Sequence, residues 1–268
     1  ITRWPRSFTR DEWSRAFKGG GQTFRIEASP GSRVSRYMFN FSEPYLLGSD
    51  IQMGIDAHYY GRYYSEWDEQ RVGGKVSFGY QWTKDFVTGF SVRGDEVKLR
   101  NPVVPTPPTL MEALGTSTLV GLRLHASYDK RDNRYFPTSG YFVSGGVEQV
   151  VGTYSYPRFD FDARYYKTIT SQPDGLGAHV LGLRATVGIT GDDTPIYEHY
   201  FAGGSQTLRG FDYRTASPRE GGQVVGGHFS LMTSAEYIFP LSQGKETPLR
   251  GILFCDAGVV QPDISNWD

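Results

Sequence analysis

The chain has 268 residues, a formal net charge of -1 and one cysteine. A near-neutral charge excludes the basic face that nucleic-acid binding requires, and one cysteine excludes an intramolecular disulfide and a cysteine-based zinc cluster. Aromatic residues make up 15% and there are 33 glycines, whereas no run approaches the roughly 18 apolar residues of a membrane-spanning helix, so we expect one β domain over residues 1–268.

Eleven segments of alternating apolar and polar residues follow one another along the chain. Alternation places successive side chains on opposite faces of a strand, so each segment is predicted to be a β-strand with one apolar and one polar face. The predicted strands are 21–29, 33–42, 51–65, 70–82, 86–98, 117–130, 140–150, 157–169, 178–190, 226–239 and 249–261. Most exceed the five or six residues usual in soluble proteins and approach the roughly 9 to 11 that cross a bilayer at a tilt.

The connections between these strands alternate between short and long. Short turns span 48–50, 83–85, 171–175 and 242–247, and long loops span 101–115 and 191–225. This layout, with aromatic residues near strand ends, is typical of a transmembrane antiparallel β-barrel whose outer face contacts the lipid bilayer. Single-chain bacterial barrels have an even number of strands, so a count of eleven predicted strands indicates that strands are missing from this chain. Alternation alone leaves a soluble β-sandwich or propeller open.

Two motifs, in this order, resemble those of a known family. The first is SYDKRDNRYFPTSGYFV at 127–143, and the second is YEHYFAGGSQTLRGFDYR at 197–214. Strand-like segments at 41–62, 234–241 and 251–260, and RWPRSF at 3–8, extend the match over nearly the whole chain. The sequence resembles the outer-membrane barrel assembly proteins typified by BamA and TamA, the bacterial surface antigen family.

The resemblance implies a sixteen-stranded barrel in which the eleven predicted strands are the third to the thirteenth. The first two strands, the last three strands and the N-terminal POTRA domains would then be absent from this chain, which begins ITRWPRSF and ends DISNWD. The implied protein helps to fold and insert β-barrel proteins into the bacterial outer membrane, without a cofactor. Its implied partners are unfolded β-barrel clients and, through the absent N-terminal domains, assembly-complex lipoproteins and periplasmic chaperones. A TamA-like or two-partner secretion translocator and a passive pore are the alternatives.

Arg209 stands between a leucine and a glycine in the second motif. A guanidinium cannot lose its charge inside a barrel, and leaving it dehydrated and unpaired would cost several kcal/mol, so it requires a carboxylate. Alternation puts Glu236 and Asp256 on the polar faces of the two strands after the loop. We therefore expect both acids to be partners of Arg209, and the resemblance implies the same acids. The alternative is that the acids are solvated and the arginine lies free in its loop.

The glycines around Arg209 complete a predicted loop latch. Gly203 and Gly204 permit backbone angles that are closed to other residues, and Gly210 is expected to let the chain approach the barrel wall closely. The resemblance implies that the Arg-Gly-Phe tip, which includes Phe211, folds back into the barrel. A phosphate-binding loop is not expected, because no lysine followed by serine or threonine comes after the glycines.

Asp129, Arg131 and Asp132 lie at a strand end before the Phe-Pro turn of the first motif. They are predicted to form a polar network that fixes the periplasmic rim, and ordinary turn chemistry is the alternative.

The sequence predicts neither catalysis nor a metal site. The five histidines are scattered and no serine lies in a G-x-S-x-G elbow, although alternation points His125 and His228 inward. Acidic and imidazole side chains gather at Asp192, Asp193, Glu198 and His199, but acidic extracellular loops are common, so this group is a weak candidate for a metal site.

Overall fold

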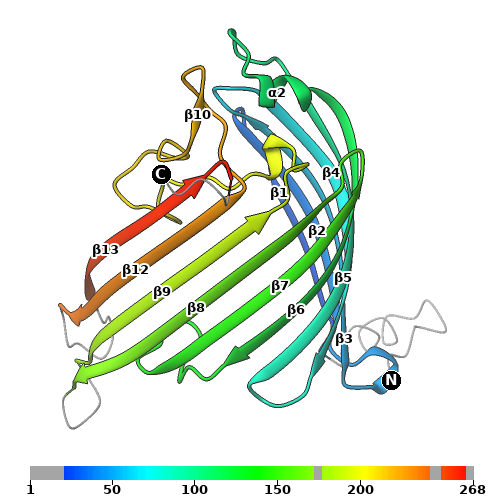
Figure 1. Cartoon of the computed structure of the whole chain (residues 1–268). Helices are drawn as coiled ribbons and strands as arrows, with labels where there is room; N and C mark the ends of the chain where they lie inside the picture. The colour runs from blue at the N-terminus through cyan, green and yellow to red at the C-terminus, as the bar shows by residue number, and fades with distance from the viewer. Residues whose placement is uncertain (1–20, 172–176, 242–248, 264–268) are drawn as a thin grey trace. The chain divides into compact units, whose positions relative to one another are not determined.

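The computed structural model describes residues 21–171, 177–241 and 249–263, and within them eleven strands form one antiparallel sheet. The order in the sheet is β1-β2-β3-β4-β5-β6-β7-β8-β9-β12-β13, so neighbours in sequence are neighbours in the sheet (Figure 1). The strands are β1 (Thr23–Ser29), β2 (Val34–Glu43), β3 (Ile51–Tyr63), β4 (Asp68–Gln81), β5 (Phe86–Arg100), β6 (Gly115–Asp129), β7 (Gly140–Gly152), β8 (Tyr156–Thr170), β9 (His179–Thr190), β12 (Phe229–Pro240) and β13 (Arg250–Gln261).

The eleven predicted strands are confirmed, with ends that shift by a few residues. Elements that alternation did not predict are short: a hairpin of β10 (Arg219–Glu220) and β11 (Gln223–Val224), helix α2 (Pro108–Glu112), and the 3-10 helices η1 (Leu46–Gly48) and η2 (Ile196–Glu198). Each has too few residues to show a period. No helix in the described ranges is long and apolar enough to cross a membrane. The predicted turn at 242–247, most of that at 171–175 and the RWPRSF motif lie outside the described residues.

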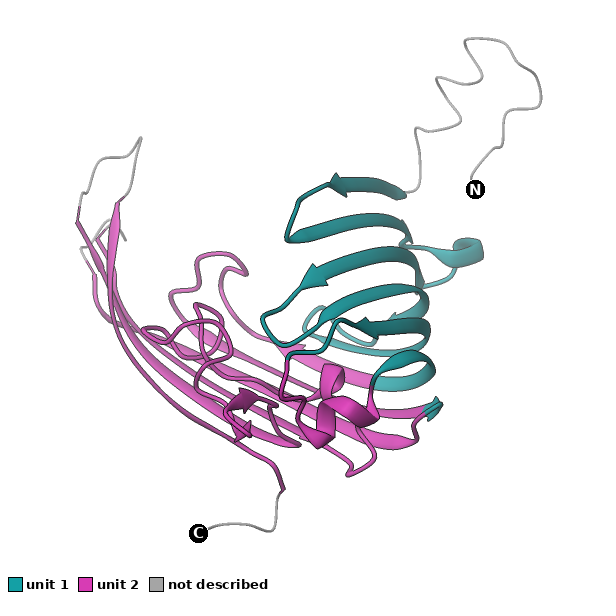
Figure 2. Cartoon of the chain, turned by 90° about the horizontal axis from the view of Figure 1, so that it is seen from above, with its two compact units in different colours: residues 1–103, 114–124, 151–153 teal, residues 104–113, 125–150, 154–268 magenta. Residues whose placement is uncertain are grey.

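The chain divides into two compact units (Figure 2). The first comprises Ile1–Val103, Leu114–Leu124 and Val151–Thr153, and the second comprises Val104–Ala113, His125–Val150 and Tyr154–Asp268. In the first unit one sheet face is polar and paired: Lys75 lies 3.3 Å from Asp56, and the buried Asp95 carboxylate lies 2.8 Å from Arg93 and 3.2 Å from His58. The opposite face exposes large apolar side chains. They include Ile55, Val72, Val76, Phe78 and Tyr80.

In the second unit two neighbouring rows of residues cross four strands with opposite character. Arg164, Arg184, Ser234 and Asp256 are cross-strand partners in one row of β8, β9, β12 and β13. The next row consists of Tyr165, Leu183, Ala235 and Cys255. Because side chains alternate between faces, the charged row and the apolar row point to opposite sides of the sheet. The long loop between β9 and β12 contacts the charged side, which we call the loop-facing side.

Candidate functional site: the Arg209 loop

The segment 200–217 forms a closed loop with its own internal hydrogen bonds. The Tyr200 and Gly227 backbones pair where the loop leaves the sheet. The Ala202 amide donates to the Ser217 hydroxyl at 2.7 Å, and the Ala202 carbonyl accepts from the Ala216 amide at 3.0 Å. These bonds satisfy the backbone of a segment that has no regular secondary structure. The following hairpin is tied to α2, since the Thr109 amide and hydroxyl both donate to Glu220, at 3.3 and 2.8 Å.

The loop's glycines are required by backbone conformation. Gly203 has φ +113° and Gly204 has φ +95°, and a Cβ on Gly203 would lie 2.3 Å from the Asp212 carbonyl oxygen. L-residues with side chains rarely adopt such angles, so only glycine fits here without strain. Gly210 differs from expectation: it also has positive φ, +92°, but no atom lies within 4 Å of the position a Cβ would take. Its role is conformational and does not come from close approach to the wall.

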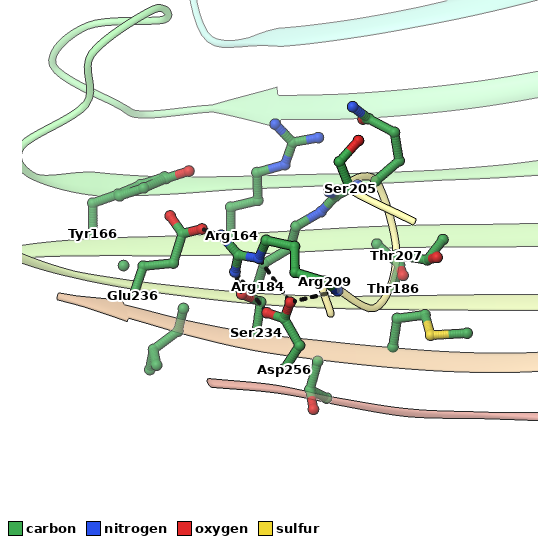
Figure 3. A pocket seen from close by; sticks show the side chains of 15 residues that line it. Arg164, Tyr166, Arg184, Thr186, Ser205, Thr207, Arg209, Ser234, Glu236 and Asp256 are labelled. Carbon is green, nitrogen blue, oxygen red and sulfur yellow. Dashed lines mark hydrogen bonds and ion pairs between the residues drawn. The ribbon is translucent and has the colours of Figure 1, made fainter. Parts of the chain in front are cut away.

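Arg209 reaches the charged row of the sheet and is held by it (Figure 3). Its Nε and Nη2 donate to the two Asp256 carboxylate oxygens at 2.7 and 2.6 Å, and its backbone amide donates to the same carboxylate at 3.1 Å. Its Nη1 donates to Glu236 at 2.6 Å and its Nη2 to the Ser234 hydroxyl at 2.8 Å. The structure thus brings together the three residues that the sequence paired.

Strand register explains why these groups converge. Ser234 on β12 lies directly across from Asp256 on β13, and Glu236 follows two residues later on the same face. The Asp256 side chain is only 5% exposed, against 25% for Arg209 and 30% for Glu236. A buried carboxylate is tolerated when a cation and hydrogen-bond donors saturate it, and here three donors do so. The hydrogen bond to Asp256, above all, raises the pKa of the Arg209 guanidinium, which therefore stays charged.

Two further groups of the site were missed from sequence. The Phe254 ring lies under the guanidinium, with 3.7 Å between the Arg209 Cζ and the ring centroid, so it adds a cation–π contact. The uncharged Ser234 hydroxyl accepts a hydrogen bond from one guanidinium nitrogen. Both share the strand face of the two acids, which is the signal that could have identified them.

Leu208 anchors the loop beside its arginine. It forms a buried apolar cluster with Ala202, Met232 and Val260. Gly258 makes room for this cluster, because a Cβ there would lie 2.3 Å from the Met232 sulfur and 3.4 Å from Leu208. The loop is therefore docked by an apolar contact and an ionic contact that are adjacent in sequence.

Phe211, the last residue of the predicted latch, is not brought to the Arg209 partners. Its side chain is 58% exposed, and its contribution within the loop is a carbonyl that accepts from the Gly204 amide at 2.9 Å.

A cavity of about 200 Å³ opens beside Arg209. Arg164, Arg184 and Tyr166 line it together with Glu236 (Figure 3). Asp162 holds the two arginines, accepting from Arg164 at 2.9 and 2.7 Å and from Arg184 at 2.9 Å. The acids beside this cavity therefore pair with arginines, and the arrangement offers ionic contacts between neighbouring strands.

The predicted rim residues separate into two hydrogen-bonded groups. Arg131 forms a fork with Asp129, with Nε and Nη2 each 2.8 Å from a carboxylate oxygen. Asp132 instead accepts from the Thr138 hydroxyl at 2.6 Å and from the Thr138 and Ser139 amides at 2.9 and 3.1 Å. Burial by itself would raise the pKa of Asp132, but these hydrogen bonds together lower it. The group thus contains an ion pair and an ordinary turn, and not one continuous network.

Known proteins resemble this chain along most of its length. The outer membrane protein assembly factor BamA of Nitratidesulfovibrio vulgaris (strain Hildenborough) is 22% identical over 264 residues, covering 93% of this chain and 32% of the relative. BamA of Neorickettsia risticii (strain Illinois) is 24% identical over 244 residues, covering 88% and 32%. The chain therefore spans about a third of the length of these relatives.

A solved structure shares the fold. The crystal structure of BamA from Haemophilus ducreyi lacking POTRA domains 1-3 matches with a TM-score of 0.78 and 19% identity, covering 90% of this chain and 52% of that chain. The predicted fold class, part of a transmembrane antiparallel β-barrel, is thereby confirmed, and the β-sandwich and propeller are excluded.

The family model for the Omp85 superfamily domain matches residues 17–265. The family and the relatives indicate the bacterial outer membrane as the location. The resemblance that the two motifs carried is confirmed: the chain belongs to the Omp85 superfamily.

Proposed function

We propose that the chain is the barrel part of an outer-membrane protein that helps to fold and insert other β-barrel proteins, and that the Arg209 loop keeps this barrel in its working conformation. Unfolded β-barrel proteins are the proposed clients, and the bilayer is the proposed surroundings of the exposed apolar row. Membership of the superfamily and the names of the relatives support this role. The same proposal makes these strands the third to the thirteenth of sixteen. It also places POTRA domains before them, which contact lipoproteins and chaperones.

The observation that carries the proposal is the forked bridge from Arg209 to acids on two neighbouring strands. All three guanidinium nitrogens donate to side-chain oxygens of the sheet. None of them is directed away toward a substrate. An arginine saturated in this way stabilises an arrangement of loop and strands, because removing it would leave Asp256 buried without its cation. The proposed role of the loop is therefore structural support of an assembly activity.

The proposal is tested by replacing the only genomic copy of the gene with an Arg209→Ala variant. We expect lower steady-state levels of several unrelated β-barrel proteins in the outer membrane, measured by quantitative proteomics of the membrane fraction. Arg219→Ala is the matched control, since Arg219 is an exposed arginine of the same loop that donates to the Gly222 carbonyl.

Three outcomes would decide against the proposal. Normal levels of all barrel proteins in the Arg209→Ala strain, with an equal amount of folded variant in the membrane, would contradict it. Loss of one secreted substrate with unchanged barrel proteins would indicate a translocator, and a large steady conductance of the wild-type protein in planar bilayers would indicate a passive pore.

A further inference from the structure

Two histidines meet at the base of the long loop. His199 follows the 3-10 helix η2, and His228 immediately precedes β12. Their Nε2 atoms are 3.0 Å apart, and their rings are nearly perpendicular, at 89°. Alternation predicted the inward direction of His228, but it could not reveal a partner that lies outside the strands.

Both ring nitrogens of His199 face backbone carbonyl oxygens. Its Nδ1 lies 2.8 Å from the Val225 carbonyl oxygen and its Nε2 lies 2.9 Å from the Thr194 carbonyl oxygen, so a neutral ring can donate to only one of the two. In the tautomer that donates from Nδ1, Nε2 carries a lone pair and faces His228. An imidazole whose other nitrogen donates to a backbone carbonyl is the arrangement seen in metal-binding histidines, because the carbonyl fixes the tautomer and the orientation of the ring.

A third electron-pair donor lies at the same point. The Thr194 carbonyl oxygen is 2.9 Å from the His199 Nε2 and also hydrogen-bonds to His228. In the His199 tautomer that donates from Nδ1, the Nε2 lone pair and this carbonyl oxygen would face each other with no proton between them. A bound cation would satisfy all three atoms while both rings stay neutral.

The spacing of the three atoms matches coordination of one ion. A first-row transition metal bonds imidazole nitrogen and oxygen at about 2.0 to 2.2 Å, so two ligands at right angles lie about 3 Å apart. The observed separations are 3.0 Å between the nitrogens and 2.9 Å from nitrogen to oxygen. Right-angled nitrogen and oxygen ligands are typical of tetragonal Cu²⁺ and Ni²⁺.

The surroundings supply space and charge for such an ion. Both histidines line a cavity of about 260 Å³, which has room for water ligands. Asp192 lines the same cavity, and the charges of Asp192 and Asp263 favour a positive charge at His228. The charge of Arg214 acts in the opposite direction on His199. Within the described ranges no three His, Cys, Asp or Glu side chains form a metal-binding group, so the ion would need the carbonyl and water as its remaining ligands.

We propose that His199, His228 and the Thr194 carbonyl bind a divalent first-row transition-metal ion, Cu²⁺ in preference to Ni²⁺ and Zn²⁺, with Asp192 as the nearby counter-charge. The site lies at the junction of η2 and β12, and it does not depend on the assembly role proposed above. Bound metal would join the two ends of the loop between β9 and β12, next to the backbone pairing of Tyr200 with Gly227.

The test uses the complete protein, purified in detergent micelles and titrated with Cu²⁺, Ni²⁺ or Zn²⁺ alone. We expect one Cu²⁺ per chain with two nitrogen ligands in the electron paramagnetic resonance spectrum, and tighter binding of Cu²⁺ than of the other two ions. His228→Gln should weaken Cu²⁺ binding at least about tenfold. His179→Gln is the matched control, because His179 lies at the start of β9 and contacts the Tyr237 hydroxyl at 2.8 Å; this variant should bind as the wild type does.

A wild-type spectrum without nitrogen ligands would overturn the proposal, and so would a nitrogen-ligated spectrum that is unchanged in folded His228→Gln. Folding of His228→Gln is judged by the mobility of heated and unheated samples on gels. If this variant does not fold, the proposal is judged by the wild-type spectrum and by the Cu²⁺ affinity of Asp192→Asn. Asp192 is exposed on the loop, so Asp192→Asn should fold, and it should weaken binding less than tenfold. Unchanged Cu²⁺ affinity in Asp192→Asn would contradict the assigned counter-charge.

Discussion

Asp256 is the residue on which the Arg209 cluster depends most. It accepts from the Arg209 backbone amide as well as from two side-chain nitrogens. Arg209→Ala therefore removes the guanidinium bonds and keeps the amide bond, whereas Asp256→Ala removes all three. Residues that share one buried ionic contact should not contribute additively to stability.

A double-mutant cycle of Arg209→Ala and Asp256→Ala measures this coupling. We expect each single change to lower the free energy of unfolding by about 3 kcal/mol, because it leaves the partner charge without its ion pair. The double variant should lose clearly less than the sum. The measurement is urea unfolding in lipid vesicles, with Arg219→Ala as the control. Strict additivity would show that the pair does not interact energetically.

Asp132 gives the turn between β6 and β7 a pH dependence. Hydrogen bonds lower its pKa below its ordinary value of 3.8 in the folded protein. A carboxyl with a depressed folded pKa stabilises the fold above the unfolded pKa, and this contribution is lost as the pH falls through the folded pKa. Asp132→Asn should therefore lower the melting temperature at pH 7, and the deficit should shrink toward pH 3. Asp50→Asn, in the exposed turn before β3, is the control; a deficit that is constant with pH would refute the assignment.

At the scale of elements, β13 and β12 form the surface on which the loop docks. Gly258→Val would place a side chain 2.3 Å from the Met232 sulfur and 2.9 Å from the Leu231 carbonyl oxygen, so the apolar cluster around Leu208 has to separate. We expect faster hydrogen exchange at residues 203–211 and a loss of stability of about 1 to 3 kcal/mol. Gly94→Ala in β5, where nothing lies within 4 Å of the added Cβ, is the control. Unchanged exchange in the loop would mean that Leu208 is not an anchor.

The same elements show what the sequence could and could not predict. The long strands were predictable because a period of two continues over ten or more residues. The pairing of Arg209 with Glu236 and Asp256 was predictable because alternation assigns a face and a dehydrated guanidinium requires acids. Met232 and Val260 lie on that same polar face, and alternation gives no reason to pair them with Leu208.

Periodicity could not predict contacts between loops. His199 and His228 come together because of the conformation of an irregular segment, which an alternating pattern does not predict. The same is true of the hydrogen bond between Thr109 and Glu220. Glycine can serve either to allow a positive φ or to let the chain approach a neighbour closely. The sequence could not decide between these for Gly210, and the structure shows the positive φ.

For the whole molecule, the apolar row through Leu183 should contact lipid. A cationic side chain on the lipid face near mid-membrane costs about 2 to 4 kcal/mol in outer-membrane barrels. Leu183→Arg should therefore reduce folding yield in lipid vesicles and lower the unfolding free energy by this amount. Leu183→Met, which keeps the volume and the apolar character, is the control. Equal folding of both variants would place this row away from lipid.

The partners of Arg209 follow it in the chain by 25, 27 and 47 residues, at Ser234, Glu236 and Asp256. Synthesis and export therefore deliver the arginine before any of the groups that hold it. The full set of contacts requires both strands, because Glu236 and Ser234 lie on β12 and Asp256 lies on β13, so we expect the ionic contact to be completed after β12 and β13 have paired. A transient form of this protein would then carry an undocked loop and an Asp256 carboxylate without its arginine, and the state of that loop would report whether β12 and β13 have paired correctly.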